Sequence, residues 1–211
     1  MQLGVDEAGK GPVLGSMFVA AVRARPADIP EDVDDSKRLT PARREELAAA
    51  IRECADAYAV VEVPVDDIDD PETDMNELTV AGHADALESV LCDGCECYLD
   101  AADTNAVRFE RRVETRLAVD VDIRAEHGAD ETYPVVAAAS ILAKVARDDH
   151  VTALESEYGA VGSGYPSDTT TRQFLREFVR EYDRLPACAR ESWQTSRDVL
   201  IEADQAALTD F

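Results

Sequence analysis

Residues 2–22 read QLGVDEAGKGPVLGSMFVAAV. The apolar residues of Gln2–Val5 predict a short strand that leads directly into an acidic pair, Asp6 and Glu7. A glycine-rich loop follows, and the apolar run Val13–Val22 predicts a second, buried strand. The chain therefore begins as a sheet in which acidic side chains stand where the first strand ends.

Beyond these residues, strands and helices alternate before helices alone close the sequence. Thr40 and Pro41 mark the start of a helix, because Thr favours the N-cap and Pro the first helical turn. We expect strands at 57–65, 96–100 and 119–124, an acidic turn at 66–70, and helices at 40–54, 75–91, 105–117, 134–158, 169–182 and 189–207. This order predicts an α/β fold, a mixed sheet flanked by helices with a C-terminal helical lobe.

The composition limits the classes of protein to which the chain can belong. It has 211 residues, of which 45% are hydrophobic, so we expect one compact domain with a real core rather than a disordered chain. No apolar run approaches the roughly 18–20 residues that cross a bilayer, so no membrane contact is expected. The N-terminus lacks the basic and apolar regions of a secretion signal, and we expect a cytoplasmic protein.

The charge is strongly acidic, with 45 acidic residues, 21 basic residues and a net charge of −24. Of the basic residues 18 are Arg and only 3 are Lys, a surface composition that indicates life in concentrated salt. The alternative is an acidic mesophilic enzyme. The remaining lysines, Lys10, Lys37 and Lys144, are expected to contact phosphate or carboxylate groups, because a compact ammonium suits such point contacts.

Five cysteines are present, an odd number that argues against a disulfide framework in a cytosolic chain. The spacing of Cys92, Cys95 and Cys97 also invites a zinc site, but no second Cys or His pair follows at finger spacing. We therefore expect plain thiols in a turn before a strand, and small core residues at Cys54 and Cys188.

Three acidic sites fall at the ends of predicted elements, where strand tips can converge. Asp6 and Glu7 end the first strand, Asp100 ends the strand at 96–100, and Asp130 precedes the helix at 134–158. Clustered carboxylates repel one another unless cations neutralise them, and their oxygens suit Mg²⁺ or Mn²⁺. Two such ions can promote the hydrolysis of a phosphodiester bond. The alternative for each acid is a structural role, as a helix cap or in a turn.

A nucleotide-binding P-loop is the competing interpretation of residues 4–10. Their spacing fits the GxxxxGK part of that motif, but Gly11 stands where Ser or Thr must hold Mg²⁺. Two acids inside the loop would also repel the phosphates, so we reject this interpretation.

Several blocks of the sequence, in the right order, resemble ribonuclease HII. They are DEAGKGPVLG at 6–15, DSKRLTPARREEL at 35–47, YLDAAD at 98–103, ADETYPVVAAASILAKVARD at 129–148, GSGYPSDTTTRQFL at 162–175 and, as in the archaeal form, SWQTS at 192–196. The resemblance implies an RNase H-like catalytic domain at 1–160 with a five-stranded mixed sheet, and a C-terminal helical extension at 161–211. It also implies hydrolysis of RNA in RNA–DNA hybrids, including single ribonucleotides embedded in duplex DNA.

The resemblance assigns roles to individual residues. The four catalytic carboxylates match Asp6, Glu7, Asp100 and Asp130; the first three would be the main ligands of two divalent ions, and Asp130 would complete the site on the nucleophile side. The loop whose backbone grips the ribose 2′-hydroxyl matches Gly9, Lys10 and Gly11. Tyr165 matches the tyrosine that stacks on the neighbouring sugar, and Ser36, Lys37 and Lys144 fall in segments that face the substrate.

Two features depart from what such an enzyme usually shows. The family usually has Arg at the position of Lys10, which puts a bidentate side-chain contact in doubt. The charge of −24 is awkward for a nucleic-acid enzyme, although in molar salt the counterion contribution to binding largely fades.

Other functions remain open at this point. They are a type 3 ribonuclease H, a catalytically inert hybrid-binding module on the same fold, and a generic metal-dependent DNA nuclease. We expect a monomer. The tail Gln205–Phe211 has Gln, Leu and a terminal aromatic near the spacing of a peptide that binds a sliding clamp, or it is a frayed helix end.

The acidic composition leads to a prediction about salt. The melting temperature should fall as KCl is lowered from molar to tens of millimolar, because the screening length grows from about 3 Å at 1 M towards about 30 Å at 0.01 M. A thermal melt in a KCl series measures this effect, and a melting temperature that does not change with KCl would contradict the high-salt interpretation.

Overall fold

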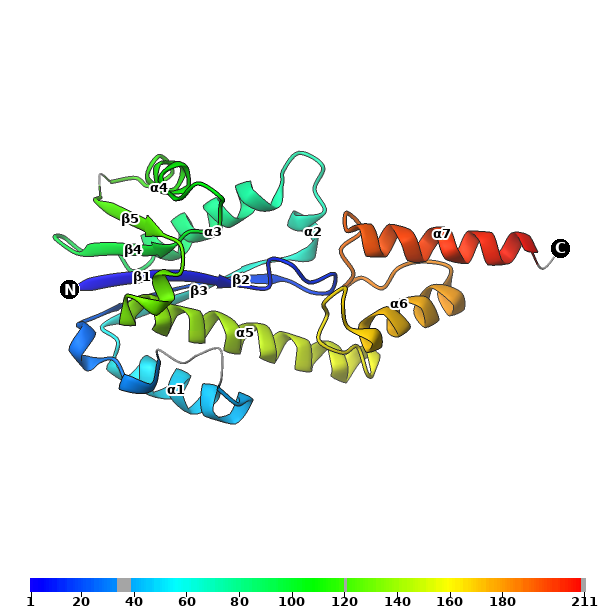
Figure 1. Cartoon of the computed structure of the whole chain (residues 1–211), viewed down its shortest axis with the longest axis horizontal. Coiled ribbons are helices and arrows are strands. Elements are labelled where there is room, and N and C mark those ends of the chain that lie inside the picture. Colours follow the sequence, from blue (N-terminus) through cyan, green and yellow to red (C-terminus); the bar gives the residue numbers. More distant parts are fainter. Residues whose placement is uncertain (34–38, 120, 210–211) are drawn as a thin grey trace.

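A five-stranded mixed sheet forms the centre of the computed structural model, in the order β3-β2-β1-β4-β5 (Figure 1). The strands are β1 Gln2–Ala8, β2 Met17–Ala24, β3 Ala57–Val63, β4 Glu96–Asp100 and β5 Ile123–Glu126. β1 pairs antiparallel with β2 and parallel with β4, β2 pairs antiparallel with β3, and β4 pairs parallel with β5. The predicted mixed sheet is therefore confirmed.

The structure describes residues 1–33, 39–119 and 121–209, with side chains of the last helix up to residue 205. Ser36 and Lys37, two of the residues predicted to face the substrate, lie outside the described residues. Within the described part of the chain, no helix is long and apolar enough to cross a membrane.

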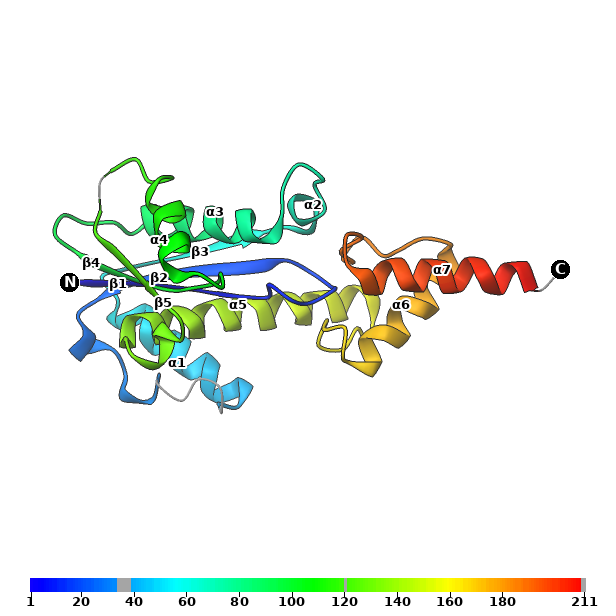
Figure 2. The ribbon, with the colours of Figure 1, turned by 45° about the horizontal axis from the view of Figure 1, so that its top comes forward.

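Helices cover both faces of the sheet. They are α1 Pro41–Cys54, α2 Val65–Ile68, α3 Met75–Glu88, α4 Ala106–Glu114, α5 Pro134–Tyr158, α6 Thr169–Tyr182 and α7 Gln194–Thr209, with short 3-10 turns η1 Pro26–Asp28 and η3 Ala129–Glu131. One core lies between the sheet and α1 with α5, and a second lies between the sheet and α3 with α4 (Figure 2). α6 and α7 lie beyond the end of the sheet (Figure 1).

The start of α5 packs directly against the backbone of β1. A Cβ atom at Gly4 would lie 2.3 Å from the carbonyl carbon of Val135, so only glycine fits at this position. The small side chains of Ala137, Ala138 and Ala139 are buried in the same core, as the small-residue run of the sequence predicts. This close packing fixes α5 over the strand that carries Asp6 and Glu7.

Several predicted boundaries differ from the structure. β1 continues through Asp6 and Glu7 to Ala8, because both acids keep their pairing with β2. The predicted strand at 13–22 begins only at Met17, since Leu14 instead forms a bridge with Ala189. For the same reason the last helix starts at Gln194 rather than at 189. The acidic turn expected at 66–70 overlaps the short helix α2, and the strand expected at 119–124 lies at 123–126.

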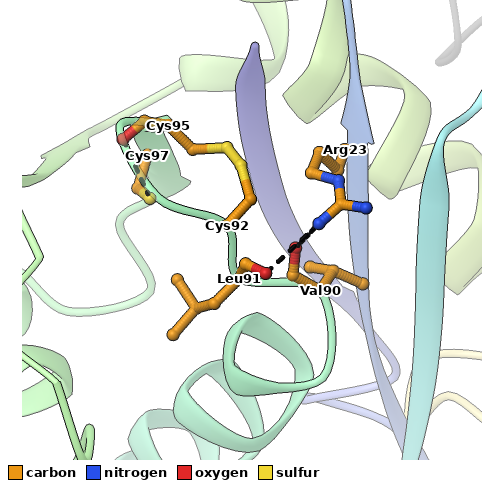
Figure 3. The surroundings of a disulfide bond; sticks show 6 residues. All are labelled: Arg23, Val90, Leu91, Cys92, Cys95 and Cys97. Carbon is orange, nitrogen blue, oxygen red and sulfur yellow. Dashed lines mark hydrogen bonds between the residues drawn. A yellow bond between two sulfur atoms is a disulfide. The ribbon is translucent and has the colours of Figure 1, made fainter.

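The expectation of plain thiols is wrong for Cys92 and Cys95, which form a disulfide in the loop between α3 and β4 (Figure 3). Their Cα atoms are 5.7 Å apart, within the usual range for such a bridge, because the left-handed Gly94 (φ 69°) folds the loop back. Arg23 holds the start of this loop by donating hydrogen bonds to the carbonyl oxygens of residues 90 and 91. Cys54, Cys97 and Cys188 are free, as expected.

A third core joins the C-terminal helices to the rest of the molecule. Val13, Leu14 and Leu154 pack there with Leu175 and Val199 from α6 and α7. The division at residue 160 stays a prediction, and this core shows that the two proposed parts bury apolar side chains against each other.

Candidate active site

Asp6 and Asp100 lie at the carboxyl ends of two neighbouring parallel strands. Val5 in β1 pairs with Leu99 in β4, and each acid follows one residue further along its strand. Parallel strands end at the same edge of a sheet, so the pairing brings the two carboxylates to one place. Glu7 is the next residue of β1, and Asp130 lies in the turn η3 that precedes α5.

The electrostatics of these acids show that they interact. Burial raises the pKa of Asp6 well above its ordinary range, and the negative charges of Glu7 and Asp100 raise it further. Burial also raises the pKa of Asp100, with Asp130 and Glu7 adding to the effect and the N–H of Ala129, 2.8 Å from the carboxylate, opposing it. The structure thus brings the four predicted carboxylates into mutual repulsion.

This group of acids fits a hard divalent cation. Its donors are carboxylate oxygens, and the repulsion between them is the cost that a bound cation removes. Among the described residues, no three His, Cys, Asp or Glu side chains stand close enough to hold an ion as they are, so an ion would draw these side chains together. Asp6, Glu7 and Asp100 are the residues that would hold it.

His83, which the sequence analysis did not assign to the site, contacts it from α3. Its ring is fully buried, and its Nε2 lies 2.9 Å from Oε2 of Glu7. The ring also packs edge-on against Phe109 of α4, with the centroids 5.0 Å apart. The only signal in the sequence was a histidine on an amphipathic helix, and nothing there connects it with Glu7.

A groove of about 740 Å³ opens beside the acids, and it collects most of the predicted substrate residues. Its lining includes Glu7, Gly9, Lys10, Gly11, Lys144 and Tyr165. Tyr165 is 46% exposed, and a Cβ atom at Gly11 would lie 3.8 Å from its ring. The glycine-rich loop and the tyrosine are therefore neighbours in the lining of one groove.

The side chain of Lys10 is engaged by the protein itself. Its Nζ donates to the carbonyl oxygen of Ala102 at 2.7 Å and to Oδ1 of Asn76 at 3.3 Å. The backbone of this loop remains part of the groove lining. The loop is therefore suited to contact a ligand through its main chain rather than through the lysine.

Arg147 is a further groove residue that the sequence analysis missed. It is buried in α5, and its Nη2 donates to the carbonyl oxygen of Leu14 at 3.0 Å. Its side chain also packs against Gly9, where a Cβ atom would lie 3.0 Å from Cδ of the arginine. An arginine on an otherwise mixed helix gave no sequence signal for this contact.

Comparisons with known proteins agree with this geometry. A family model described as Ribonuclease HII matches residues 3–196. The Ribonuclease HII of Halobacterium salinarum is 61% identical over 211 residues, which cover 100% of this chain and 99% of the relative. The solved ribonuclease H2 of Pyrococcus horikoshii superposes with a TM-score of 0.89 at 37% identity, covering 96% of this chain and 98% of that one. The ribonuclease HII in a PCNA:RNase HII complex from Archaeoglobus fulgidus has a TM-score of 0.84 at 36% identity and covers 94% and 96% of the two chains.

The buried acid leads to a prediction about Asp6→Asn. In molar KCl without divalent ions, this variant should melt higher than the wild type, by about 2–4 °C if the relief is about 1 kcal/mol. The gain should shrink as the pH falls through the raised pKa of Asp6, because the folded wild type then takes up a proton and loses the charge that Asn removes.

Melting curves with and without Mn²⁺ or Mg²⁺ measure both effects. Divalent ions should raise the melting temperature of the wild type but not that of Asp6→Asn. The control is Asp85→Asn, which changes an exposed acid of α3 and should behave as wild type. An equal response of Asp6→Asn and wild type to the ions would remove Asp6 from the metal site.

Proposed function

Since the chain belongs to the ribonuclease HII family and is thus a type 2 ribonuclease H acting on RNA–DNA hybrids, we propose that it also cuts at single ribonucleotides embedded in duplex DNA. We further propose that it does so by two-metal-ion hydrolysis of the phosphodiester bond. The acidic composition and the relative from Halobacterium salinarum agree with the archaeal, high-salt form.

One observation carries the proposal: Glu7 lines the same groove as the glycine-rich loop and Tyr165, and its neighbour Asp6 stands beside Asp100 at the paired ends of β1 and β4. A phosphodiester bound in this groove next to the ribose that the loop contacts would lie beside the carboxylates. A DNA nuclease needs the carboxylates but has no use for a site that selects a 2′-hydroxyl. An inert binding module has no use for acids that repel one another.

Members of this family depend on divalent metal ions, and the acids of this chain would have different roles in binding them. Asp6, Glu7 and Asp100 would hold Mg²⁺ or Mn²⁺, and Asp130 would complete the site on the side from which water attacks. Two ions bound there would activate the attacking water and stabilise the leaving oxygen. The N–H of Ala129 donates to Oδ1 of Asp100 and orients this carboxylate.

Selection of RNA would rest on the other side of the groove. The backbone of Gly9–Gly11 can approach the ribose closely and hydrogen-bond the 2′-hydroxyl, the group that separates RNA from DNA. The half-exposed ring of Tyr165 can stack on the neighbouring sugar or base. Lys144 and Arg147 add positive charge to a groove on an acidic protein.

The experiment that tests this function is cleavage of a DNA duplex that contains one ribonucleotide, with Mg²⁺ or Mn²⁺. The wild type should cut it and leave the same duplex without the ribonucleotide intact. Tyr165→Ala should reduce this cleavage about tenfold or more, since base–aromatic stacking is worth about 1–3 kcal/mol. Tyr165→Phe keeps the ring and should lose much less.

The control is Tyr182→Ala, a tyrosine of α6 that is 51% exposed and does not line the groove. It should cut at the wild-type rate. Equal losses by Tyr165→Ala on the single ribonucleotide and on an all-RNA hybrid would show that Tyr165 does not recognise the deoxyribose next to a single ribonucleotide. A large drop in melting temperature with both activities reduced in proportion would assign Tyr165 a structural role instead.

We also propose that the tail at 205–211 binds a sliding clamp. The Archaeoglobus fulgidus relative was solved as a PCNA:RNase HII complex, and α7 carries the end of this chain away from the sheet (Figure 1). Calorimetric titration with an archaeal clamp should give binding for the full chain and none for a chain that ends at residue 204. Both chains should cleave an RNA–DNA hybrid equally, and clamp binding by the shortened chain would place the contact elsewhere.

A further inference from the structure

We propose that Arg190 and Trp193 are positioning residues that hold the glycine-rich loop from behind, so that the N–H groups of Lys10 and Gly11 face the groove. This inference rests on the proposed function, and it identifies the residues that make the loop selective for ribose. Both residues lie in the segment that precedes α7, close to the loop after β1 in both views of the molecule (Figures 1 and 2).

Arg190 is fully buried and donates to main-chain carbonyl oxygens only. Its Nη2 lies 2.6 Å from the oxygen of Gly9, its Nη1 3.0 Å from that of Lys10, and its Nε 2.8 Å from that of Gly15. Within the described residues it forms no ion pair with a carboxylate. The guanidinium thus donates its hydrogen bonds to the loop, and it does so as a buried charge that no described carboxylate contacts directly.

Trp193 continues this series of contacts. Its Nε1 donates to the carbonyl oxygen of Gly11 at 3.2 Å, and the guanidinium of Arg190 lies 4.8 Å from the centre of its ring. An arginine over an indole face is a favourable cation–π arrangement. Three consecutive carbonyl groups, those of Gly9, Lys10 and Gly11, are therefore held by two side chains that support each other.

The geometry of the peptide bond determines which way the N–H groups of this loop point when its carbonyl oxygens are held. In a trans peptide the C=O of one residue and the N–H of the next point in opposite directions, and the described chain has no cis bond. Because Arg190 holds the oxygens of Gly9 and Lys10, the N–H groups of Lys10 and Gly11 point away from it. The loop lines the groove, so these two donors are available to a ligand there.

The next peptide group shows where the series of donors ends. The carbonyl of Gly11 is bonded to the nitrogen of Pro12, which carries no hydrogen. Trp193 fixes this carbonyl without turning any further N–H towards the groove. Two adjacent main-chain donors are thus presented, a number that suits one hydroxyl oxygen of a sugar.

A purely structural role, fastening the C-terminal helices to the sheet, is the competing explanation. That fastening already exists in the main chain: the N–H of Gly15 donates to the oxygen of Cys188 at 2.7 Å, and the N–H of Arg190 donates to the oxygen of Val13 at 2.9 Å. The bonds from Nη1, Nη2 and the indole reach further, to the part of the loop that borders the groove. They are the bonds that substitution can remove while the main-chain contacts stay.

The test uses Trp193→Phe, which keeps an aromatic ring against Arg190 and removes one hydrogen bond, and Arg190→Lys, which removes the forked donors. The measured quantity is the ratio of the inhibition constant of a DNA duplex to the KM of an RNA–DNA hybrid of the same sequence. This ratio should fall about threefold to tenfold in Trp193→Phe, as expected for the loss of one hydrogen bond. It should fall further in Arg190→Lys.

Amide hydrogen exchange of the full-length protein bound to an RNA–DNA hybrid, without divalent ions, supplies a readout that does not depend on cleavage. The bound hybrid should slow exchange at Lys10 and Gly11 in the wild type and slow it less in both variants. The matched control is Arg176→Gln, which breaks an exposed ion pair with Glu202 between α6 and α7 and should change neither the ratio nor the exchange.

The outcomes separate the two proposals. The role of Arg190 and Trp193 alone would be overturned by one result: the wild type prefers the hybrid, and both variants keep this preference and the full slowing of exchange by the bound hybrid. If the wild type bound DNA and hybrid equally and did not cut at ribonucleotides, the proposed function would be overturned. The proposal that the loop selects ribose would then be overturned with it. A fall in melting temperature with an unchanged ratio would assign the two residues to structural fastening.

Discussion

The contact between the backbone of α5 and Gly4 of β1 is the constraint on which the rest of this structure depends. With a Cβ atom excluded at Gly4, the helix lies directly on the strand, and every residue of α5 takes its place from there. The turn before the helix then sets Asp130 near Asp100, and the helix itself carries Lys144 and Arg147 to the groove. One close approach of two backbones therefore aligns the acids and the substrate groove.

The clustered acids, unlike the contact at Gly4, destabilise the fold locally. Asp6 is buried beside Glu7 and Asp100, and burial together with these two negative charges raises its pKa. The carboxylate of Glu7 instead contacts the buried ring of His83. In the proposed metal site, a bound cation would compensate for this repulsion, and the free energy that the acids cost the fold would add to affinity for the ion.

Sequence patterns predicted the elements well where the signal was local. β4, α5 and α6 have the expected bounds. The signals that mark these bounds, such as the proline in the first turn of α5 and the aspartate that caps α6, lie within a few residues of the boundary itself. The four acids were found by their place at element ends, and the resemblance to a family completed that set.

Contacts between distant residues could not be found in this way. His83 is 76 residues from Glu7, and Arg190 is 181 residues from Gly9. The end of β1 was misplaced because pairing with β2 overrides the polarity of Asp6 and Glu7. The disulfide of Cys92 and Cys95 was missed because an odd number of cysteines says nothing about which two a tight turn brings together.

The separation of 181 residues between Gly9 and Arg190 has a consequence for synthesis of the protein on the ribosome. The glycine-rich loop is synthesised before the side chains that hold it, because Arg190 and Trp193 follow it along the chain. Until they arrive, β1 and β2 can pair while the loop between them lacks its support. If Arg190 and Trp193 have the proposed role, a nascent chain that has not yet reached them would assemble its sheet and its acids before it could discriminate ribose from deoxyribose.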